Sequence, residues 1–199
     1  MSADFIYLAS QSPRRQELLR QIGVPFQLLT PQDPQAAEAL ETALPNEAPS
    51  KYVRRVVLAK LDAALLRLAA GGLEQAPVLA ADTVVAIGGR MLGKPANRDD
   101  AAAMLKLLSG RTHRVLTAVA LASASRREVC VNVSRVRFAR LTSTQIADYV
   151  ASEEPFDKAG GYGIQGPAGA FVRRIEGSYS GIMGLPLHET ARMLRGVLG

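Results

Sequence analysis

Cysteine is almost missing from this 199-residue sequence, and long apolar runs are missing altogether. The single cysteine, Cys130, excludes an intramolecular disulfide and any zinc site built on several thiolates, and it fits a reducing compartment. Because no stretch approaches about 18 uninterrupted apolar residues, we expect no membrane span. Residues 1–9 are too short and too uncharged for a signal peptide. These absences predict a soluble cytoplasmic protein with no membrane partner.

Tryptophan is absent, and so is any run of five or more like charges, although 24 basic and 18 acidic side chains give a net charge of +6. That excess suits an anionic partner. The aromatic RNP pattern, the zinc-finger spacing and the basic leucine-zipper region are all missing. We therefore expect no nucleic-acid partner. A small anionic ligand needs only a few cations.

The histidines and the cysteine indicate no chemistry. His113 lies in a strand-like run and His188 in the last predicted helix, and neither has a second histidine or a cysteine at ligand spacing. Cys130 lies between Val129 and Val131, which favours a small core residue over a nucleophile.

The apolar residues, 48% of the chain, are enough for a sizeable core, and their spacing alternates between strand and helix periods. Strands are predicted at residues 5–9, 24–29, 78–81, 112–122, 128–141 and 171–175, with a hairpin turn at Gly88-Gly89. Helices are predicted at 14–21, 50–70, 97 or 99 to 108, 142–151 and 186–198, with Ser12, Ser50 and Thr142 among the caps. The pattern predicts one domain, residues 1–199, of α/β class, with an elongated mixed sheet, flanking helices and two lobes around a central cleft.

The segment 30–49 interrupts this pattern. It is rich in proline, glutamine, alanine and glutamate, and only a short helix at 35–40 is predicted within it. Loops of this length are usually functional or mobile. We hypothesise that the segment closes over a ligand as a lid.

The first motif suited to chemistry is Ser10-Gln11-Ser12-Pro13-Arg14-Arg15, which stands where a strand ends and a helix begins. A helix N-terminus presents free N–H groups and the positive end of the helix dipole. Hydroxyl and guanidinium groups placed there suit a phosphate or a carboxylate. An ordinary capped helix with solvent-facing arginines is an equal alternative for this motif alone.

Asp82 and Thr83 directly follow the predicted strand 78–81. Ligands of α/β proteins bind at the carboxyl ends of strands, where an aspartate is able to hold a metal or to deprotonate a water. Taken alone, a local turn bond made by a strand-end aspartate is the simpler explanation.

Two glycine-containing segments follow. Gly93-Lys94-Pro95 would let backbone and ammonium approach a phosphate, although the order and spacing of a P-loop are absent. The segment 156–166 contains four glycines, an Asp-Lys pair and Gln165, whose amide both donates and accepts and so suits a base edge. A glycine-rich structural turn is the alternative.

In their order along the chain, these motifs resemble the Maf family of nucleoside triphosphate pyrophosphatases. The resemblance covers about residues 5 to 196 and includes Ala81-Asp82-Thr83-Val84-Val85, Leu108-Ser109-Gly110, residues 157–166 and Gly184-Leu185-Pro186-Leu187 in addition to the segments above. It implies a metal-dependent enzyme that cleaves nucleoside triphosphates in a cleft between lobes, and a homodimer. Arg14-Arg15, Thr83 and Gln165 resemble the branch that acts on dTTP and UTP rather than the 7-methyl-GTP branch.

The resemblance also implies roles for individual residues. Asp82 would accept a proton from the attacking water or hold the metal. Lys60, eight residues after Tyr52 as in the family's Tyr-Val…Lys helix, would neutralise the triphosphate together with Arg15 and Lys94. Ser10, Ser12 and the N-terminus of the helix would bind the substrate beside them. The base would be selected by Arg14, Thr83 and Gln165.

One position departs from the family pattern. The family usually carries an Asp-Glu or Glu-Glu pair upstream of the Tyr-Val…Lys helix, whereas here Leu40 precedes Glu41. The resemblance implies that Mg²⁺ or Mn²⁺ is held by Asp82 and Glu41, with Asp33 as a competing ligand.

The predicted reaction is in-line attack of water on the α-phosphorus of dTTP or UTP, with pyrophosphate leaving, as house-cleaning of the nucleotide pool. One alternative is hydrolysis of modified purine nucleotides, such as 7-methyl-GTP or inosine-type nucleotides. Another is a non-enzymatic regulator of cell division that binds a nucleotide or a nucleic acid. The combination of Asp82 with several phosphate-ready cations favours catalysis, because binding alone does not need it.

Overall fold

The computed structural model describes residues 4–31 and 33–198. Residues 1–3, 32 and 199 lie outside the described residues. Residues 1–3 belong to the segment tested for a signal peptide, residue 32 to the predicted loop 30–49, and residue 199 to the end of the predicted domain. None of the helices in the described ranges has the length and apolar character needed to cross a membrane.

Within these ranges, seven strands form one mixed sheet in the order β2-β1-β3-β5-β6-β7, with β4 paired to β3. The strands are β1 (Ile6–Leu8), β2 (Phe26–Leu28), β3 (Val78–Ile87), β4 (Arg90–Leu92), β5 (Thr112–Ala122), β6 (Arg127–Phe138) and β7 (Val172–Glu176). β1 is parallel to β2 and β3, and the remaining pairs are antiparallel. The prediction of an α/β fold with an elongated mixed sheet is confirmed.

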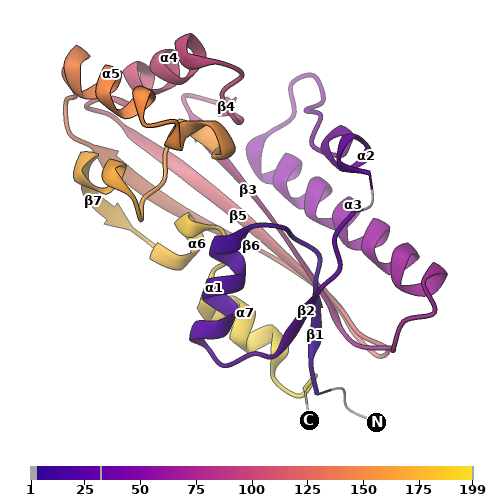
Figure 1. The fold of residues 1–199 in the computed structure, drawn as a ribbon. Helices are drawn as coiled ribbons and strands as arrows, with labels where there is room; N and C mark the ends of the chain where they lie inside the picture. The colour runs from indigo at the N-terminus through magenta and orange to yellow at the C-terminus, as the bar shows by residue number, and fades with distance from the viewer. Residues whose placement is uncertain (1–3, 32, 199) are drawn as a thin grey trace.

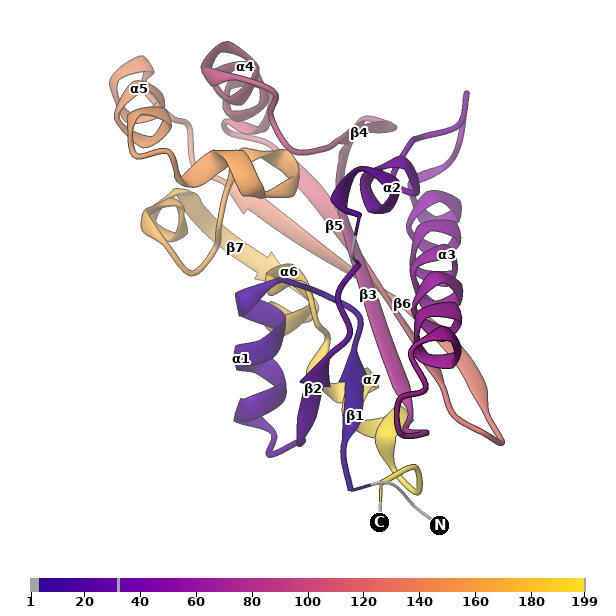
Figure 2. The same cartoon turned by 45° about the vertical axis from the view of Figure 1, so that its right-hand side comes forward.

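Helices cover both faces of this sheet (Figures 1 and 2). They are α1 (Pro13–Gln21), α2 (Pro34–Ala39), α3 (Pro49–Ala70), α4 (Arg98–Leu108), α5 (Ser143–Ala151), α6 (Tyr179–Met183) and α7 (Leu187–Leu194), with short 3-10 turns at Glu154–Asp157, Ala159–Gly161 and Pro167–Phe171. The long helix α3 packs on one face. On the other face, α1 and α7 cover one end of the sheet, and α4 and α5 cover the other.

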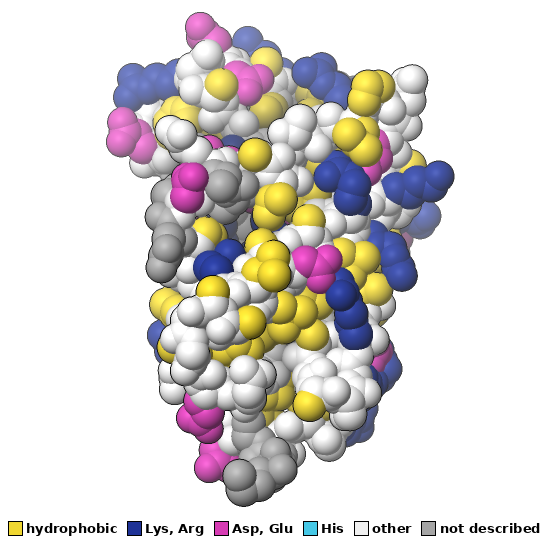
Figure 3. Space-filling view, turned by 90° about the vertical axis from the view of Figure 1, so that its right-hand side faces the viewer, with side chains coloured by type: hydrophobic (Ala, Val, Ile, Leu, Met, Phe, Trp, Pro, Cys, Tyr) yellow, Lys and Arg dark blue, Asp and Glu magenta, His cyan; other side chains and the backbone are white. Residues whose placement is uncertain are grey.

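Alternation along β3 explains this arrangement. Val78, Ala80, Asp82, Val84 and Ala86 point toward α3, and Leu79, Ala81 and Val85 point toward the opposite face. A strand buried on both faces is expected to be apolar almost throughout, as β3 is. Around α3, Figure 3 shows Lys and Arg side chains in separate groups with apolar surface between them, so the positive charge on this side is spread out.

The edge of β3 that faces β1 and β4 is open in its middle. β1 pairs with β3 at Val78 and Leu79, and β4 pairs with β3 from Val85 onward. Between these two points, no strand of the described chain pairs with β3 on this edge, while β5 continues along its other edge. Asp82 lies in this gap.

This placement corrects the prediction that Asp82 follows the end of a strand. β3 does not stop at residue 81 but runs on to Ile87, because the apolar residues after Thr83 pair with β5 in an unbroken register. The neighbouring strand β1 ends instead. The strand end at which a ligand has access is therefore the end of β1, which lies next to the middle of β3.

Several element ends also differ from the predictions. α3 begins at Pro49 after Ala48, so Ser50 is not its cap; proline at the first position sets the helical φ in advance. The predicted strand 24–29 is confined to β2, the last helix ends at Leu194, and α6 was not predicted. The caps of α4 by Asn97 and of α5 by Thr142 are confirmed.

Candidate active site

A cavity of about 790 Å³ opens at the gap beside the middle of β3. This volume lies within the range of ligand-binding pockets, roughly 300–1,000 Å³. The structure brings all ten predicted site residues to its wall: Ser10, Ser12, Arg14, Arg15, Glu41, Lys60, Asp82, Thr83, Lys94 and Gln165. Asp33, the competing metal ligand, lines it as well. The roles of these residues stay predictions, but residues up to 155 positions apart in the sequence share one cavity.

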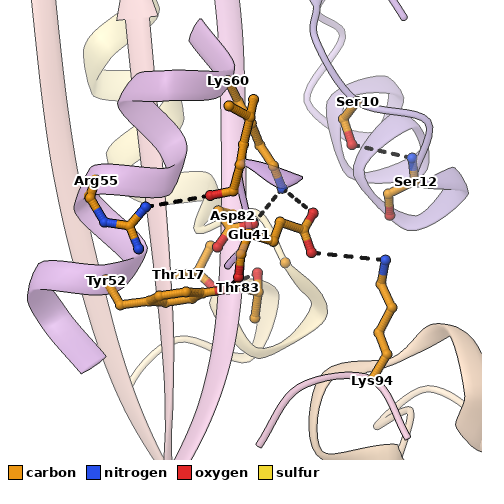
Figure 4. Close-up of polar contacts among 12 residues, drawn as sticks. Ser10, Ser12, Glu41, Tyr52, Arg55, Lys60, Asp82, Thr83, Lys94 and Thr117 are labelled. Atoms are coloured by element: carbon orange, nitrogen blue, oxygen red, sulfur yellow. Dashed lines mark hydrogen bonds and ion pairs between the residues drawn. The ribbon is translucent and has the colours of Figure 1, made fainter. Parts of the chain in front are cut away.

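The ammonium group of Lys60 joins two carboxylates at the centre of this wall. Its Nζ donates to Oδ1 of Asp82 at 2.6 Å and to Oε1 of Glu41 at 2.7 Å. From the opposite side, Nζ of Lys94 lies 4.0 Å from Oε2 of Glu41 (Figure 4). The side chain of Asp82 is 7% exposed, whereas that of Lys94 is 50% exposed and faces the cavity. The cluster alternates positive and negative groups.

Cations also set the charge state of Glu41. Burial alone would raise the pKa of its carboxyl group, but the charges of Lys60, Lys94 and Arg15 outweigh burial and lower it. Glu41 is therefore ionised at neutral pH and available as an acceptor or a ligand.

Arg15 connects three elements rather than projecting freely. Its Nε donates to the carbonyl of Gly184 at 2.9 Å, its Nη1 to Oγ of Ser10 at 3.1 Å, and its Nη2 to Oγ1 of Thr83 at 3.3 Å. Burial lowers the pKa of this guanidinium, while Asp82 and Glu41 act in the opposite direction. Three of its five N–H donors are thus engaged, and the other two remain for a ligand.

The hydroxyl of Thr83 is committed to the same network. Thr117 donates its hydroxyl proton to the carbonyl of Gly181 at 2.7 Å, so the 2.9 Å contact between the two threonines has Thr83 as the donor. Because Thr83 also accepts from Arg15, a base would meet only its remaining lone pair.

The beginning of α1 is capped from outside the helix. Ser12 occupies the N-cap position, but its side chain makes no capping bond; instead Oγ of Ser10 accepts from the backbone N–H of Ser12 at 3.2 Å. Arg14 reaches from the first turn to Asp157 on the other side of the cavity, with Nη1 3.4 Å from Oδ2. Burial would raise the pKa of Asp157, but Lys158 and Arg14 lower it.

The loop that carries Gln165 is fixed by buried contacts. Gly160 has a φ of +74°, and a Cβ there would lie 2.9 Å from Cγ2 of Val85, so only glycine fits against β3. The N–H of Gly163 donates to the hydroxyl of Tyr149 at 3.1 Å. The hydroxyl of Tyr162 lies 2.7 Å from Nε2 of His113. His113 is therefore structural, as predicted, and Gln165 at the exposed rim is held by its neighbours.

Cys130 also has a structural place. It is half-buried on β6 and packs against the cluster that α1 and α7 form with the sheet. Burial raises the pKa of its thiol, with Glu189 acting in the same direction, which disfavours the nucleophilic thiolate.

Two carboxylates are enough for the metal that the resemblance implies. Among the described residues no three His, Cys, Asp or Glu side chains gather as a metal cage. Mg²⁺, however, is usually bound through one or two carboxylates together with phosphate oxygens of the substrate. Asp82 and Glu41 converge on one point, the ammonium of Lys60, so their donor set fits this mode of binding.

The cavity wall contains functional candidates that the sequence analysis left out. Tyr52 and Arg67 lie on the face of α3 that carries Lys60, and Lys158 lies in the loop opposite. The hydroxyl of Tyr52 donates to the carbonyl of Glu41 at 2.9 Å. Tyr52 and Arg67 stand eight residues before and seven after Lys60, so helical spacing from Lys60 would have identified both.

The chain is similar to known proteins over nearly its whole length. Residues 5–197 match the family described as Maf-like protein. A protein of Albidiferax ferrireducens named dTTP/UTP pyrophosphatase is 57% identical over 193 residues, which cover 97% of this chain and 96% of that protein. Proteins of the same name from Polaromonas sp. and Ralstonia nicotianae are 56% and 59% identical, over 98% and 95% of this chain and 96% and 92% of their own lengths.

A solved structure is similar only remotely. The Ham1 protein of Staphylococcus aureus aligns with 67% of this chain and 71% of its own, at 13% identity and a TM-score of 0.39, a likeness too weak to carry an argument.

A mixed α/β sheet whose central strand borders a cavity with several charged side chains in its wall defines a ligand-binding protein of the enzyme type. The match over nearly the whole length identifies it further: the chain belongs to the Maf-like protein family.

Proposed function

We propose that this protein hydrolyses dTTP and UTP to the monophosphate and pyrophosphate. The observation that carries the proposal is the Asp82–Lys60–Glu41 cluster. It lies in a cavity whose wall includes five further cations: Arg14, Arg15, Arg67, Lys94 and Lys158. A triphosphate carries about four negative charges, and in phosphoryl transfer the protein acts mainly through positioning and electrostatics. The shared name of the three relatives supports the same substrates.

The chemistry divides between a base and the cations. Water attacks the α-phosphorus, the bond from that phosphorus to the bridging oxygen breaks, and pyrophosphate leaves. Asp82 accepts the proton of the attacking water, because it is the carboxylate most deeply placed beside the open edge of β3. Lys60, Lys94 and Arg15 spread the negative charge that develops on the phosphate oxygens.

A divalent cation fits beside these groups. Asp82 and Glu41 would hold Mg²⁺ or Mn²⁺ together with phosphate oxygens. When bound, the cation neutralises charge on those oxygens and so lowers the barrier to attack. Lys60 keeps the two carboxylates together when no substrate is present.

Base selection is assigned to the rim of the cavity. Arg14, which pairs with Asp157, and Gln165, which lies on the same loop as Asp157, both line the cavity. A site that pairs with the polar edge of a base rejects bases that leave its groups unpaired. We expect pyrimidines to be preferred over the purine nucleotides that the sequence left as an alternative, in keeping with the name dTTP/UTP pyrophosphatase of the three relatives.

The test is release of pyrophosphate from a panel of canonical and modified nucleoside triphosphates, with Mg²⁺, with Mn²⁺ and with a chelator. We expect turnover concentrated on dTTP and UTP and abolished by the chelator. Turnover centred on 7-methyl-GTP or inosine triphosphate would refute the substrate assignment. Nucleotide binding without any release would refute the enzymatic function and favour a regulator.

A further inference from the structure

Glu41 stands on a segment that has little apolar anchorage of its own. None of residues 40–47 belongs to the buried hydrophobic core, and Leu44 is 54% exposed. Nevertheless the carboxylate of Glu41 lies within hydrogen-bonding distance of Lys60, a side chain on a different element. Something other than hydrophobic packing must hold this segment, because a loop without such contacts would not keep one carboxylate in place.

Arg55 on α3 supplies those contacts. Its Nε and Nη2 donate to the two carboxylate oxygens of Glu47, each at 2.7 Å, which is the paired geometry that only a guanidinium offers. The same group donates to the carbonyl of Leu40 at 3.5 Å and to that of Thr42 at 2.9 Å. These are the residues immediately before and after Glu41.

Tyr52 completes the attachment one turn earlier on α3. Its hydroxyl donates to the carbonyl of Glu41 itself at 2.9 Å, and the guanidinium of Arg55 lies 5.6 Å from the centre of its ring. Three successive carbonyls, those of residues 40, 41 and 42, are thus held by two side chains of one rigid helix. Figure 4 shows Tyr52, Arg55 and Lys60 on α3, with Glu41 beside Lys60 and Asp82.

We propose that Arg55 and Glu47 form a clasp that positions the carboxylate of Glu41 for the reaction. Neither residue of the clasp lines the cavity, so Arg55 is a positioning residue that acts through Glu41 and does not touch the substrate. The side chain of Glu47 is 8% exposed and that of Arg55 35%, so the carboxylate is shielded from solvent while the guanidinium is partly exposed. The inference rests on the proposed function, since Glu41 matters only if this cavity is the active site.

The test compares Arg55→Gln, Arg55→Lys and Glu47→Gln with the wild type and with Arg54→Gln. Arg54 is the matched control, because it is an exposed arginine on the same helix turn without a hydrogen bond among the described contacts. Each variant is placed in the wild-type and in the Glu41→Gln background. Pyrophosphate release from dTTP gives kcat and KM, and amide hydrogen exchange reports on residues 40–47.

We expect Arg55→Gln to lower kcat/KM by about 10- to 100-fold, as is typical when a group that orients a ligand or catalytic carboxylate is removed. In the Glu41→Gln background the same change should cause no further loss, because the clasp then has no carboxylate to position. Arg55→Lys should not restore activity, since an ammonium lacks the planar fork. Arg54→Gln should behave as the wild type does.

Amide exchange gives a second readout that does not depend on turnover. Exchange of residues 40–47 should accelerate by about tenfold or more in Arg55→Gln, since hydrogen bonds to charged groups are lost, while exchange in β3 stays unchanged. Glu47→Gln keeps the bonds from Arg55 to the carbonyls of Leu40 and Thr42, so we expect it to fold. If Arg55→Gln fails to fold, Glu47→Gln should still show a smaller acceleration of exchange in residues 40–47.

Two results would overturn the clasp. Equal losses from Arg55→Gln with and without Glu41 would mean that Arg55 acts independently of that carboxylate, and unchanged exchange would mean that it does not hold the segment. If the wild type releases no pyrophosphate from any nucleotide, the proposed function fails, and the exchange measurement alone then decides on the clasp.

Discussion

Acidification should destabilise this protein through one buried histidine. His113 on β5 is 1% exposed, and its ring packs edge-on against Phe138 and Tyr162. Burial lowers the pKa of its imidazole from 6.5 to about 4. In the folded state the ring therefore stays neutral until the solution is strongly acidic. Within residues 4–31 and 33–198 its Nδ1 has no hydrogen-bond partner, so a proton added there would be a buried charge without a counter-ion.

The sign follows from proton uptake by the unfolded chain. Between pH 6.5 and pH 4 the unfolded state binds a proton at this histidine and the folded state does not. The free energy of unfolding consequently falls as the pH falls through this window, and the contribution of His113 is fully lost below about pH 4. At 1.36 kcal/mol for each pKa unit, the loss is about 3 kcal/mol.

Urea unfolding at a series of pH values measures this loss. His113→Gln should show a pH dependence weaker by about 3 kcal/mol between pH 7 and pH 4. The carboxylates titrate equally in both proteins, so the difference isolates the imidazole. His188→Gln is the control, because it removes the other histidine, which is exposed and lies outside the buried surroundings of His113. Equal pH dependence in His113→Gln and the wild type, or an NMR titration of His113 near pH 6.5 in the folded protein, would refute the reasoning.

Three further substitutions test the site and its support. Asp82→Asn should lower kcat for dTTP by about 10²–10⁴-fold in a pyrophosphate-release assay, and near wild-type turnover would exclude Asp82 as the base. Gln165→Ala should reduce the ratio of kcat/KM for dTTP to that for purine triphosphates more than it reduces kcat; equal losses on all nucleotides would contradict base selection. Gly160→Ala should destabilise the folded protein by about 1–3 kcal/mol more than Gly89→Ala, because both glycines have positive φ but only a Cβ at Gly160 would meet Val85. Thermal unfolding measures both losses of stability, and equal losses would show that the contact with Val85 is harmless.

Local patterns were sufficient for most of the secondary structure. The proline at the start of α1, the glycine pair between β3 and β4, and the capping residues Asn97 and Thr142 each act on the backbone within a few residues. Ser50 failed as a cap because Pro49 before it already fits the first helical position. α6 was missed, since only five residues offer too little periodicity to detect.

The position of Asp82 shows where such patterns stop. A polar pair inside an apolar run, such as Asp82-Thr83, is typical of a strand end. β3 nevertheless continues, because β5 pairs with it across that point. The opening beside Asp82 comes from the other edge, where β1 ends and β4 has not begun. Which strand ends beside which is a long-range pairing, and no spacing along β3 itself encodes it.

The sequence by itself determined the class of fold and ten of the residues that meet in the cavity, because the order of short motifs is a property of the chain. Only the tertiary structure decided how those residues share their bonds. Lys60 joins Asp82 to Glu41. Arg15 donates hydrogen bonds to Ser10, Thr83 and the carbonyl of Gly184. Arg55 holds the backbone on both sides of Glu41. Except for the short-range bond from Arg15 to Ser10, these contacts join segments that are well separated in the sequence, so their geometry exists only in the folded chain.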